Sequence, residues 1–249
     1  MVNLNWNQVI MIEESKEMEK EITVITGGSS GLGLELSKCF VHATNVCIVS
    51  RDETKLNKAK TDISRSSTKT KQVLAFKADV SKEEQVKKLY EFLKGFVIKR
   101  IINCAGFGKF GPPSNINAEM VDSLIDSNLK SVIFMSSNAL LAMKENGGQI
   151  VSILSSAALK GNPQETIYCA VKWGARGYNE ALKAACKGTN INIITICPGG
   201  INTQFWRSDS GIFPDVSKFM NPKELANVIY SILIERKTLY CPDIVIEKL

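Results

Sequence analysis

The residues best suited to chemistry are Tyr168 and Lys172, four positions apart, with Ser155 thirteen residues before the tyrosine. In a helix, residues i and i+4 share one face, so the phenol and the ammonium are expected to lie side by side. The ammonium favours the phenolate, and we expect it to lower the pKa of Tyr168. Such a phenol can donate a proton to a carbonyl as a hydride arrives, or take one from an alcohol, while the serine hydroxyl polarises the same oxygen.

A glycine-rich turn, Thr26-Gly27-Gly28-Ser29-Ser30-Gly31-Leu32-Gly33, supports this chemistry. It follows a short apolar segment and opens a helical one, which is the setting of a dinucleotide-binding turn. Gly27 allows the tight turn, Gly31 the close approach of a pyrophosphate, and Gly33 the packing of helix against strand. The free N–H groups at the start of that helix attract phosphates. The alternative, an ordinary strand-to-helix turn, needs no such spacing.

The second predicted strand ends at Ser50-Arg51-Asp52, about 20 residues after the turn, where an adenosine ribose is read. An acidic residue at the strand tip accepts hydrogen bonds from a ribose 2′-hydroxyl, whereas Arg51 pairs with a 2′-phosphate. Ser50 and Arg51 occupy the tip, so we predict NADP(H) over NAD(H). The alternative is that Arg51 is a solvated surface charge and Asp52 discriminates between the cofactors, leaving NAD(H) open.

Two further strand ends carry polar or small residues. Asp79-Val80 closes the third strand, where the Asp79 carboxylate could hydrogen-bond the edge of an adenine ring. The alternative is that Asp79 caps the helix that follows. Asn103-Cys104-Ala105-Gly106 closes the fourth, and its small residues would let the backbone lie against a cofactor.

Short apolar segments alternate with helical patterns from Glu21 to the C-terminus. This order implies right-handed crossovers and a parallel sheet covered on both faces. We therefore predict an α/β, Rossmann-type doubly wound parallel sheet of about seven strands in a single domain, residues 21–249, preceded by an extension, residues 1–20, that could be disordered. The predicted strands are 22–26, 45–50, 73–78, 100–103, 149–154, 191–196 and 244–246, and the helices 32–41, 52–63, 82–92, 118–144, 165–187 and 222–234.

Composition excludes several classes of protein. The net charge of +6 is spread along the chain and aromatic residues make up 7%, so we expect no nucleic-acid partner. Seven cysteines without Cys-x-x-Cys spacing predict free thiols in a reducing compartment, and with His42 as the sole histidine we expect no metal site. Without a secretory signal or a long apolar segment, the chain is expected to be cytoplasmic and not bound to a membrane.

From about Glu21 onward the chain resembles the short-chain dehydrogenase/reductase family, in its branch of roughly 250 residues. The resemblance implies a catalytic tetrad of Asn128, Ser155, Tyr168 and Lys172. Family spacing favours Ser155 over Ser156, and without the resemblance Asn128 would be an unremarkable polar residue. The marks of the resemblance are the 26–33 turn, Asp79-Val80, Asn103-x-Ala105-Gly106, Asn128, Ser155, Tyr168-x-x-x-Lys172 and Pro198-Gly199-x-x-x-Thr203.

The resemblance also assigns roles around a nicotinamide cofactor. It implies that Lys172 binds the nicotinamide ribose, that the helix with Asn128 holds a relay water, and that the segment with Pro198, Gly199, Ile201 and Thr203 lies near the nicotinamide amide. Residues of about 203–222 are expected to form a substrate lid. Its aromatic side chains, with Phe107 and Phe110, either form an apolar pocket wall or pack on the body of the domain.

These patterns predict an NADP(H)-dependent oxidoreductase acting on a carbonyl or secondary alcohol, with Tyr168 as general acid and base. The residues expected to bind the cofactor are Gly27, Ser29, Ser30, Gly31, Leu32, Gly33, Ser50, Arg51, Asp79, Val80, Asn103, Ala105, Gly106, Tyr168, Lys172, Pro198, Gly199, Ile201 and Thr203. The resemblance implies a small-molecule substrate and a homodimer or homotetramer. A cofactor-binding sensor or scaffold with little turnover is the alternative.

Overall fold

The computed structural model describes residues 20–67, 70–206, 211, 214–234 and 239–249. The predicted extension, apart from Lys20, lies outside the described residues, as do parts of the predicted lid. Strands and helices alternate along the chain: β1 (Glu21–Thr26), α2 (Gly31–Phe40), β2 (Asn45–Ser50), α3 (Glu53–Ser66), β3 (Val73–Lys77), α4 (Glu83–Phe92), β4 (Val97–Asn103), α5 (Ala118–Ile125), α6 (Ser131–Ala142), β5 (Gly148–Ile153), α7 (Thr166–Ala185), β6 (Ile191–Pro198), α8 (Pro222–Leu233) and β7 (Asp243–Ile246).

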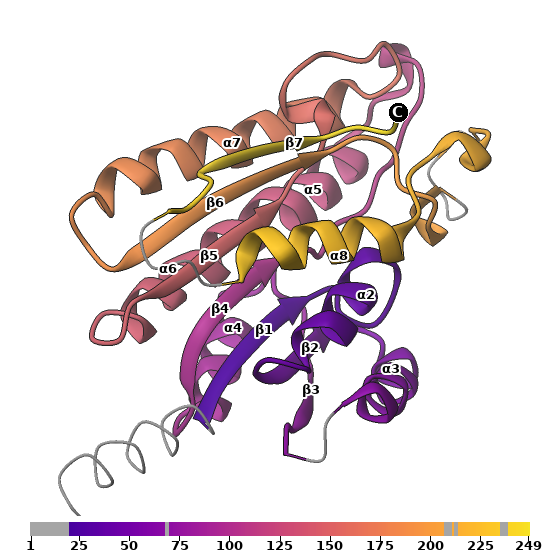
Figure 1. Cartoon of the computed structure of the whole chain (residues 1–249). Coiled ribbons are helices and arrows are strands. Elements are labelled where there is room, and N and C mark those ends of the chain that lie inside the picture. The colour runs from indigo at the N-terminus through magenta and orange to yellow at the C-terminus, as the bar shows by residue number, and fades with distance from the viewer. Residues whose placement is uncertain (1–19, 68–69, 207–210, 212–213, 235–238) are drawn as a thin grey trace, which may run out of the picture.

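The seven strands form one parallel sheet in the order β3-β2-β1-β4-β5-β6-β7, as Figure 1 shows, which confirms the predicted fold class. From β1 the chain builds outward through β2 to β3 and then returns to place β4 on the other side of β1. Thr26 at the end of β1 pairs with Asn103 at the end of β4. The connection that follows β1 runs toward β2, and the connection that follows β4 runs the other way, toward β5. A crevice therefore opens between them at the carboxyl ends of β1 and β4.

Helices cover both faces of the sheet. Residues of α2, α3 and α8 pack in one apolar cluster, and residues of α4, α6 and α7 pack in a second cluster on the other face. In Figure 1, α2 and α8 lie on the face nearer the viewer. Successive strand residues alternate between the two clusters: Val24 belongs to the second and Ile25 to the first. Both sides of each central strand are therefore buried, which explains the continuous apolar segments in the sequence.

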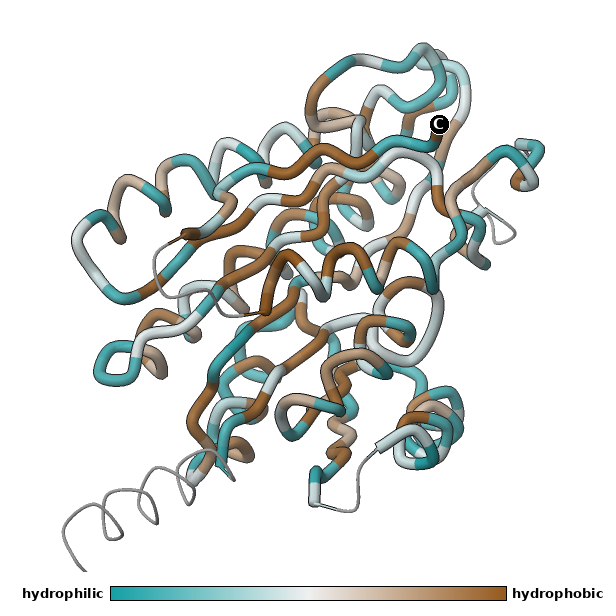
Figure 2. The backbone as a smooth tube through the Cα atoms, viewed as in Figure 1, coloured by the Kyte–Doolittle hydropathy of each residue, from teal (hydrophilic) through white to brown (hydrophobic). Residues whose placement is uncertain are grey.

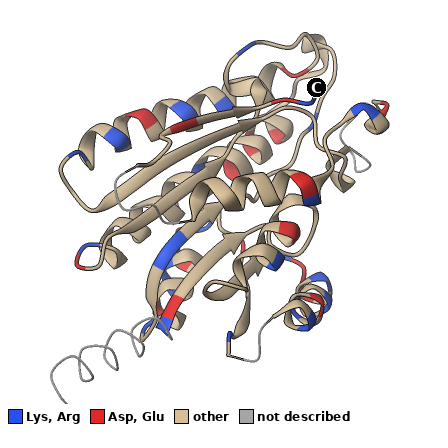
Figure 3. Cartoon of the chain, viewed as in Figure 1, with Lys and Arg blue, Asp and Glu red and all other residues tan. Residues whose placement is uncertain are grey.

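The polar and apolar residues separate accordingly. Figure 2 shows the hydrophobic colour concentrated along the central strands and the helix sides that cover them. Figure 3 shows that most charged residues lie in the helices and loops and that few lie along the strands. Among the described residues, no helix is both long enough and apolar enough to cross a membrane.

The predicted helix 118–144 differs from the structure in one respect. It consists of α5 and α6 joined by a wider π-helical turn, Asp126–Lys130. Asn128 lies in that turn and is 1% exposed. Its amide nitrogen donates to the carbonyl oxygens of Leu124 and Phe107, at 3.2 and 3.0 Å. A π-turn adds one residue to a single helical turn, and sequence spacing alone did not distinguish this local insertion from a continuous α-helix.

Candidate active site

The glycine-rich turn is held in place by the end of β4. The side-chain oxygen of Thr26 accepts hydrogen bonds from the backbone N–H groups of Cys104 and Ala105, each at 3.1 Å. Gly27 has a φ of 69°, and a Cβ there would stand 3.0 Å from the Ala105 backbone. A Cβ on Gly33 would stand 2.4 Å from the Gly27 carbonyl oxygen, so α2 packs directly on the turn. Both positions therefore require glycine.

Two adjoining cavities, of about 630 and 620 Å³, run along the carboxyl ends of the strands. They share Gly27, Ser30, Ala105, Gly106 and Phe107, and so form one continuous cleft. The first cavity contains the predicted residues Ser29, Ser50, Arg51, Asp79 and Val80. The second contains the predicted residues Gly31, Leu32, Gly33, Ser155, Tyr168, Lys172, Pro198, Gly199, Ile201 and Thr203.

Two of the predicted residues, Asn103 and Asn128, line neither cavity. Asn103 is 3% exposed and donates to the Ser136 hydroxyl at 3.1 Å, which ties the end of β4 to α6. Asn128 lies behind Gly106, and its buried side-chain oxygen has no hydrogen-bond partner among the described residues. A buried amide oxygen without a partner is a position where a water or a ligand group would bind.

At the β2 end of the cleft, Arg51 and Asp52 differ in what they are free to bind. Arg51 is exposed, lines the cavity, and forms no ion pair with the described acidic residues. Asp52 caps α3: its carboxylate accepts from the Lys55 backbone N–H at 3.0 Å and lies 3.7 Å from the Lys55 ammonium. The carboxylate of Asp79 accepts from the backbone N–H and the hydroxyl of Ser81, at 3.0 and 2.7 Å. Of these three charged side chains, Arg51 is therefore the one that is free to bind a ligand group.

The predicted reacting group lies at the other end, in the second cavity. Tyr168 and Lys172 are 6% and 5% exposed, and the lysine ammonium is 5.5 Å from the centre of the tyrosine ring. Ser155 adopts an extended conformation after β5, its side chain accepts from the Ala157 backbone N–H at 3.1 Å, and it lines the same cavity as Tyr168. Ser156 also lines the cavity. Of the two serines, Ser155 is the one that affects the phenol, because it acts to lower the pKa of Tyr168.

Burial dominates the electrostatics of this pair. It raises the pKa of Tyr168 well above its ordinary value; Ser155 opposes the rise, and the nearby Glu165 carboxylate adds to it. Burial also lowers the pKa of Lys172 to about 8. The lowered Tyr168 pKa predicted from the tyrosine–lysine spacing is therefore wrong for the chain by itself, because the cost of removing the phenolate from water outweighs the interactions that favour it.

Aromatic side chains enclose the same cavity. Phe107, Phe205, Trp206 and Phe219 line it, and the ring centres of Phe205 and Tyr168 are 5.9 Å apart. Phe110 does not line it: it is 5% exposed and packs behind these rings. Both predictions for the aromatic residues therefore hold in part. Four of these side chains form a wall of the cavity, and Phe110 packs on the body of the domain.

Comparison with known proteins then places the chain in a family. The family model described as short chain dehydrogenase matches residues 21–211. The chain belongs to the short-chain dehydrogenase family. It is 34% identical to the 3-oxoacyl-acyl-carrier-protein reductase FabG of Chlamydia muridarum, over 72% of this chain and 73% of that protein. It is 29% identical to the sepiapterin reductase of Chlorobaculum tepidum, over 75% and 80% of the two chains.

Solved structures of this family have the same fold. A short-chain dehydrogenase/reductase from Vibrio parahaemolyticus superposes with a TM-score of 0.80 and is 31% identical, covering 91% of this chain and 96% of that one. An actinorhodin polyketide ketoreductase with NADPH superposes with a TM-score of 0.82 at 21% identity, covering 92% and 96%. The second likeness shows the fold alone.

The site of this short-chain dehydrogenase fits the nicotinamide cofactor that the family uses. The required glycines keep side chains out of the turn, the cleft is continuous from Arg51 to Tyr168, and the unpartnered oxygen of Asn128 lies beside Gly106. Gly27 and Gly33 bring backbone close to the helix start, where N–H groups attract phosphate.

Several cavity residues were not found by sequence reasoning. Most come from loops or helix starts, where no spacing distinguishes a cavity residue from a solvated one. Glu165 is different, because it precedes Tyr168 by three positions, and helical spacing could have placed it on the same side. Among the polar and charged residues concerned are Lys55, Ser81, Lys109, Glu119, Ser123, Lys160, Asn162 and Glu165.

Proposed function

We propose that this short-chain dehydrogenase is an NADP(H)-dependent oxidoreductase that interconverts a small carbonyl compound and its secondary alcohol. One observation carries the proposal: Ser155, Tyr168 and Lys172 line the same cavity as the glycine-rich turn. Reductase names among the similar proteins, including the 3-oxoacyl-acyl-carrier-protein reductase and the ketoacyl reductase HetN of a Nostoc species, support a carbonyl as the substrate.

In this proposal Tyr168 is the general acid and base. Burial keeps its phenol protonated, which suits it to donate a proton to the carbonyl oxygen during reduction. Ser155, which lines the same cavity, polarises the same oxygen. When bound, NADP(H) supplies or accepts the hydride through its nicotinamide ring. Lys172 places a cation next to the phenol and stabilises negative charge that develops there during alcohol oxidation.

The cofactor preference rests on the β2 end of the cleft. Since the Asp52 carboxylate is engaged by the α3 N-terminus and Lys55, it is held away from a ribose hydroxyl. Arg51 lines the cavity and can pair with a 2′-phosphate. This arrangement supports NADP(H) over NAD(H), the assignment that the sequence also favours.

The experiment that tests the proposal is the Tyr168→Phe substitution. We expect kcat with NADPH and a ketone to fall by about 10²–10⁴-fold, because general acid catalysis contributes that much. NADPH binding, measured by fluorescence titration, should survive. Tyr178→Phe is the matched control, since its hydroxyl contacts Ser137 and the Ile133 carbonyl outside the cleft. Unchanged turnover in Tyr168→Phe would refute the role of the phenol, and binding without turnover in the wild type would favour a sensor.

A further inference from the structure

Glu165 brings a carboxylate into the cavity that holds Tyr168. It is the residue immediately before α7, and it lines the same cavity as Tyr168 three positions later. Helical neighbours at this spacing have Cβ atoms about 5–6 Å apart. If a substrate carbonyl binds at the Tyr168 hydroxyl, a charged group at this distance lies beside one of the two substituents of that carbonyl.

The charge of this carboxylate is not neutralised by the protein. One oxygen accepts a hydrogen bond from the Asn162 amide at 2.9 Å, and the side chain makes no capping bond to α7. It forms no ion pair with any lysine or arginine that the structure describes; Lys160 lines the same cavity but is exposed and remains apart. The field of Glu165 reaches the phenol, because it contributes to the raised pKa of Tyr168. A half-buried anion therefore faces the substrate space.

Part of the remaining wall is aromatic, formed by Phe205, Trp206 and Phe219. The ring centres of Phe205 and Trp206 are 5.1 Å apart, as are those of Trp206 and Phe219. The indole N–H of Trp206 donates to the Ile201 carbonyl at 3.0 Å, which fixes the ring. Aromatic faces attract cations as well as apolar groups. A carboxylate combined with such walls is the chemistry that recognises an ammonium group on an apolar body.

We propose that Glu165 is a specificity-determining residue that selects a carbonyl substrate carrying an ammonium group two or three carbons from the carbonyl carbon. The apolar remainder of the substrate packs on Phe205, Trp206 and Phe219. This inference rests on the proposed function and extends it, because it names the substrate class that the same cavity accepts. The separation follows from the one-turn spacing between Glu165 and the proton donor Tyr168.

A structural role for Glu165 predicts something different. A carboxylate at a helix N-terminus stabilises the helix whatever the substrate is, so its loss would affect cationic and neutral substrates alike. Glu165→Gln keeps the size of the side chain and an oxygen that can accept from Asn162, and it removes only the charge. Glu180→Gln is the matched control, a carboxylate on the same helix that pairs with Lys183 and lies outside the cavities.

The probes are β-(dimethylamino)propiophenone, which is cationic at neutral pH, and isocaprophenone, its uncharged carbon isostere. We measure kcat/KM for each with NADPH, and binding of each by calorimetry. The wild type and Glu180→Gln are expected to favour the cation by about tenfold, the effect of one charge-assisted contact in a partly exposed site. In Glu165→Gln the ratio should fall to about one, and in Glu165→Lys it should invert.

The outcomes separate this inference from the proposed function. Turnover of both ketones at equal efficiency by the wild type overturns the role of Glu165 and leaves the reductase intact; this result does not depend on any variant folding. A preference that persists in Glu165→Gln overturns it as well. If neither ketone is reduced but calorimetry shows a preference for the cation that Glu165→Gln abolishes, Glu165 recognises the ammonium and the proposed reaction fails. No preference in binding or turnover overturns the inference.

Discussion

The side-chain oxygen of Asn128 lies only 2.6 Å from the point where a Cβ on Gly106 would stand. The Lys172 ammonium is 3.7 Å from the same point. The backbone of Gly106 therefore lies against two buried polar groups, Asn128, which lies outside the cleft, and Lys172, which lines it. The π-turn that carries Asn128 and the loop after β4 meet at this glycine, so residues far apart in the sequence depend on its missing side chain.

Gly106→Ala should impair catalysis more than folding. The added methyl group must displace the Asn128 carboxamide, and a shift of about 1 Å in such a site costs about 10²-fold in rate. Steady-state kinetics with NADPH and a ketone would measure the loss in kcat/KM. Gly161→Ala is the control, because a Cβ there meets nothing within 4 Å. Equal activity of the two variants would contradict the close packing at Gly106.

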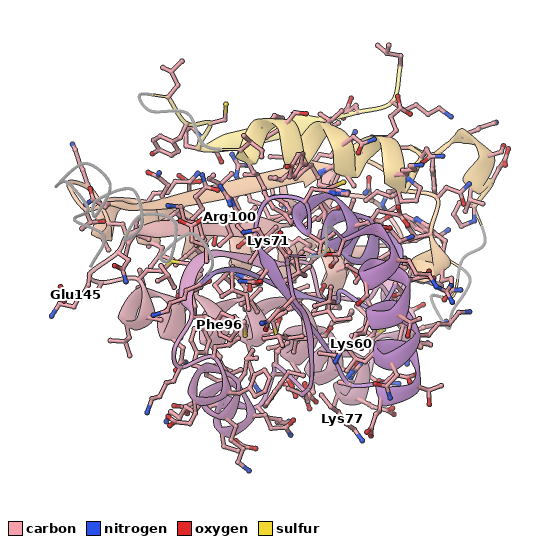
Figure 4. All side chains as sticks on the ribbon, turned by 60° about the horizontal axis from the view of Figure 1, so that its bottom comes forward. Lys60, Lys71, Lys77, Phe96, Arg100 and Glu145 are labelled. Carbon is pink, nitrogen blue, oxygen red and sulfur yellow. The ribbon has the colours of Figure 1, made fainter. Side chains whose placement is uncertain are left out.

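Arg51→Ala should weaken NADPH binding selectively. Loss of a charge-assisted contact to a 2′-phosphate is expected to raise the Kd for NADPH by about tenfold, while the Kd for NADH changes by less than about twofold. Fluorescence titration with both cofactors measures this. Lys60→Ala removes an exposed cation on α3, labelled in Figure 4, that lines neither cavity, and should leave both constants unchanged. Tighter binding of NADH than NADPH by the wild type would reverse the cofactor assignment.

Lys172 should make stability depend on pH. Burial lowers the pKa of its ammonium to about 8, so above that pH the unfolded chain holds a proton that the folded chain has released. The contribution of Lys172 to the free energy of unfolding should therefore rise with pH, by at most about 1.4 kcal/mol per unit between about pH 8 and about pH 9.5, and the gain is lost as the pH falls through 8. Cysteines such as Cys47 and Cys186, whose pKa values burial raises, act in the same window with the opposite sign, because their unfolded thiols release protons that the folded ones keep. Comparison with a variant of Lys172 isolates the lysine, since both proteins contain the same cysteines.

Urea denaturation of the chain without cofactor, at both ends of this window, measures the effect. Lys172→Met removes the titrating group, so the stability of the wild type relative to this variant should increase with pH. A constant difference between the two proteins would show that the folded ammonium titrates as it does in water.

Arg100→Ala should destabilise the fold. Arg100, labelled in Figure 4, is 3% exposed and donates to the Gln149 side chain at 2.7 Å and to the Leu233 carbonyl at 3.1 Å. Its guanidinium also lies 5.5 Å from the centre of the Phe40 ring. Truncation leaves buried acceptors unsatisfied and opens a cavity, at a cost of about 3 kcal/mol. Chemical denaturation measures this loss, and Arg65→Ala, at an exposed α3 position, should change stability by less than about 0.5 kcal/mol.

The sequence by itself determined the sheet, the glycine-rich turn and the placement of Tyr168 and Lys172 on one side of a helix. Apolar segments such as that around Val24 and Ile25 are readable because a parallel strand buries both of its sides. Gly27 and Gly33 are readable because local geometry allows only glycine there. Tyr168 and Lys172 share a helix face by spacing alone.

Only the tertiary structure decided the pKa of Tyr168 and which side chains line the cavity around it. The pKa of Tyr168 rises because surrounding elements remove water from it, an effect that spacing to Lys172 does not contain. Asn128 meets Gly106 through a π-turn that sequence spacing alone did not distinguish from a continuous α-helix. The Asp52 carboxylate is engaged in capping α3, and Glu165 lines one cavity together with aromatic residues that follow β6. Each of these depends on contacts between distant segments, which the folded chain alone creates.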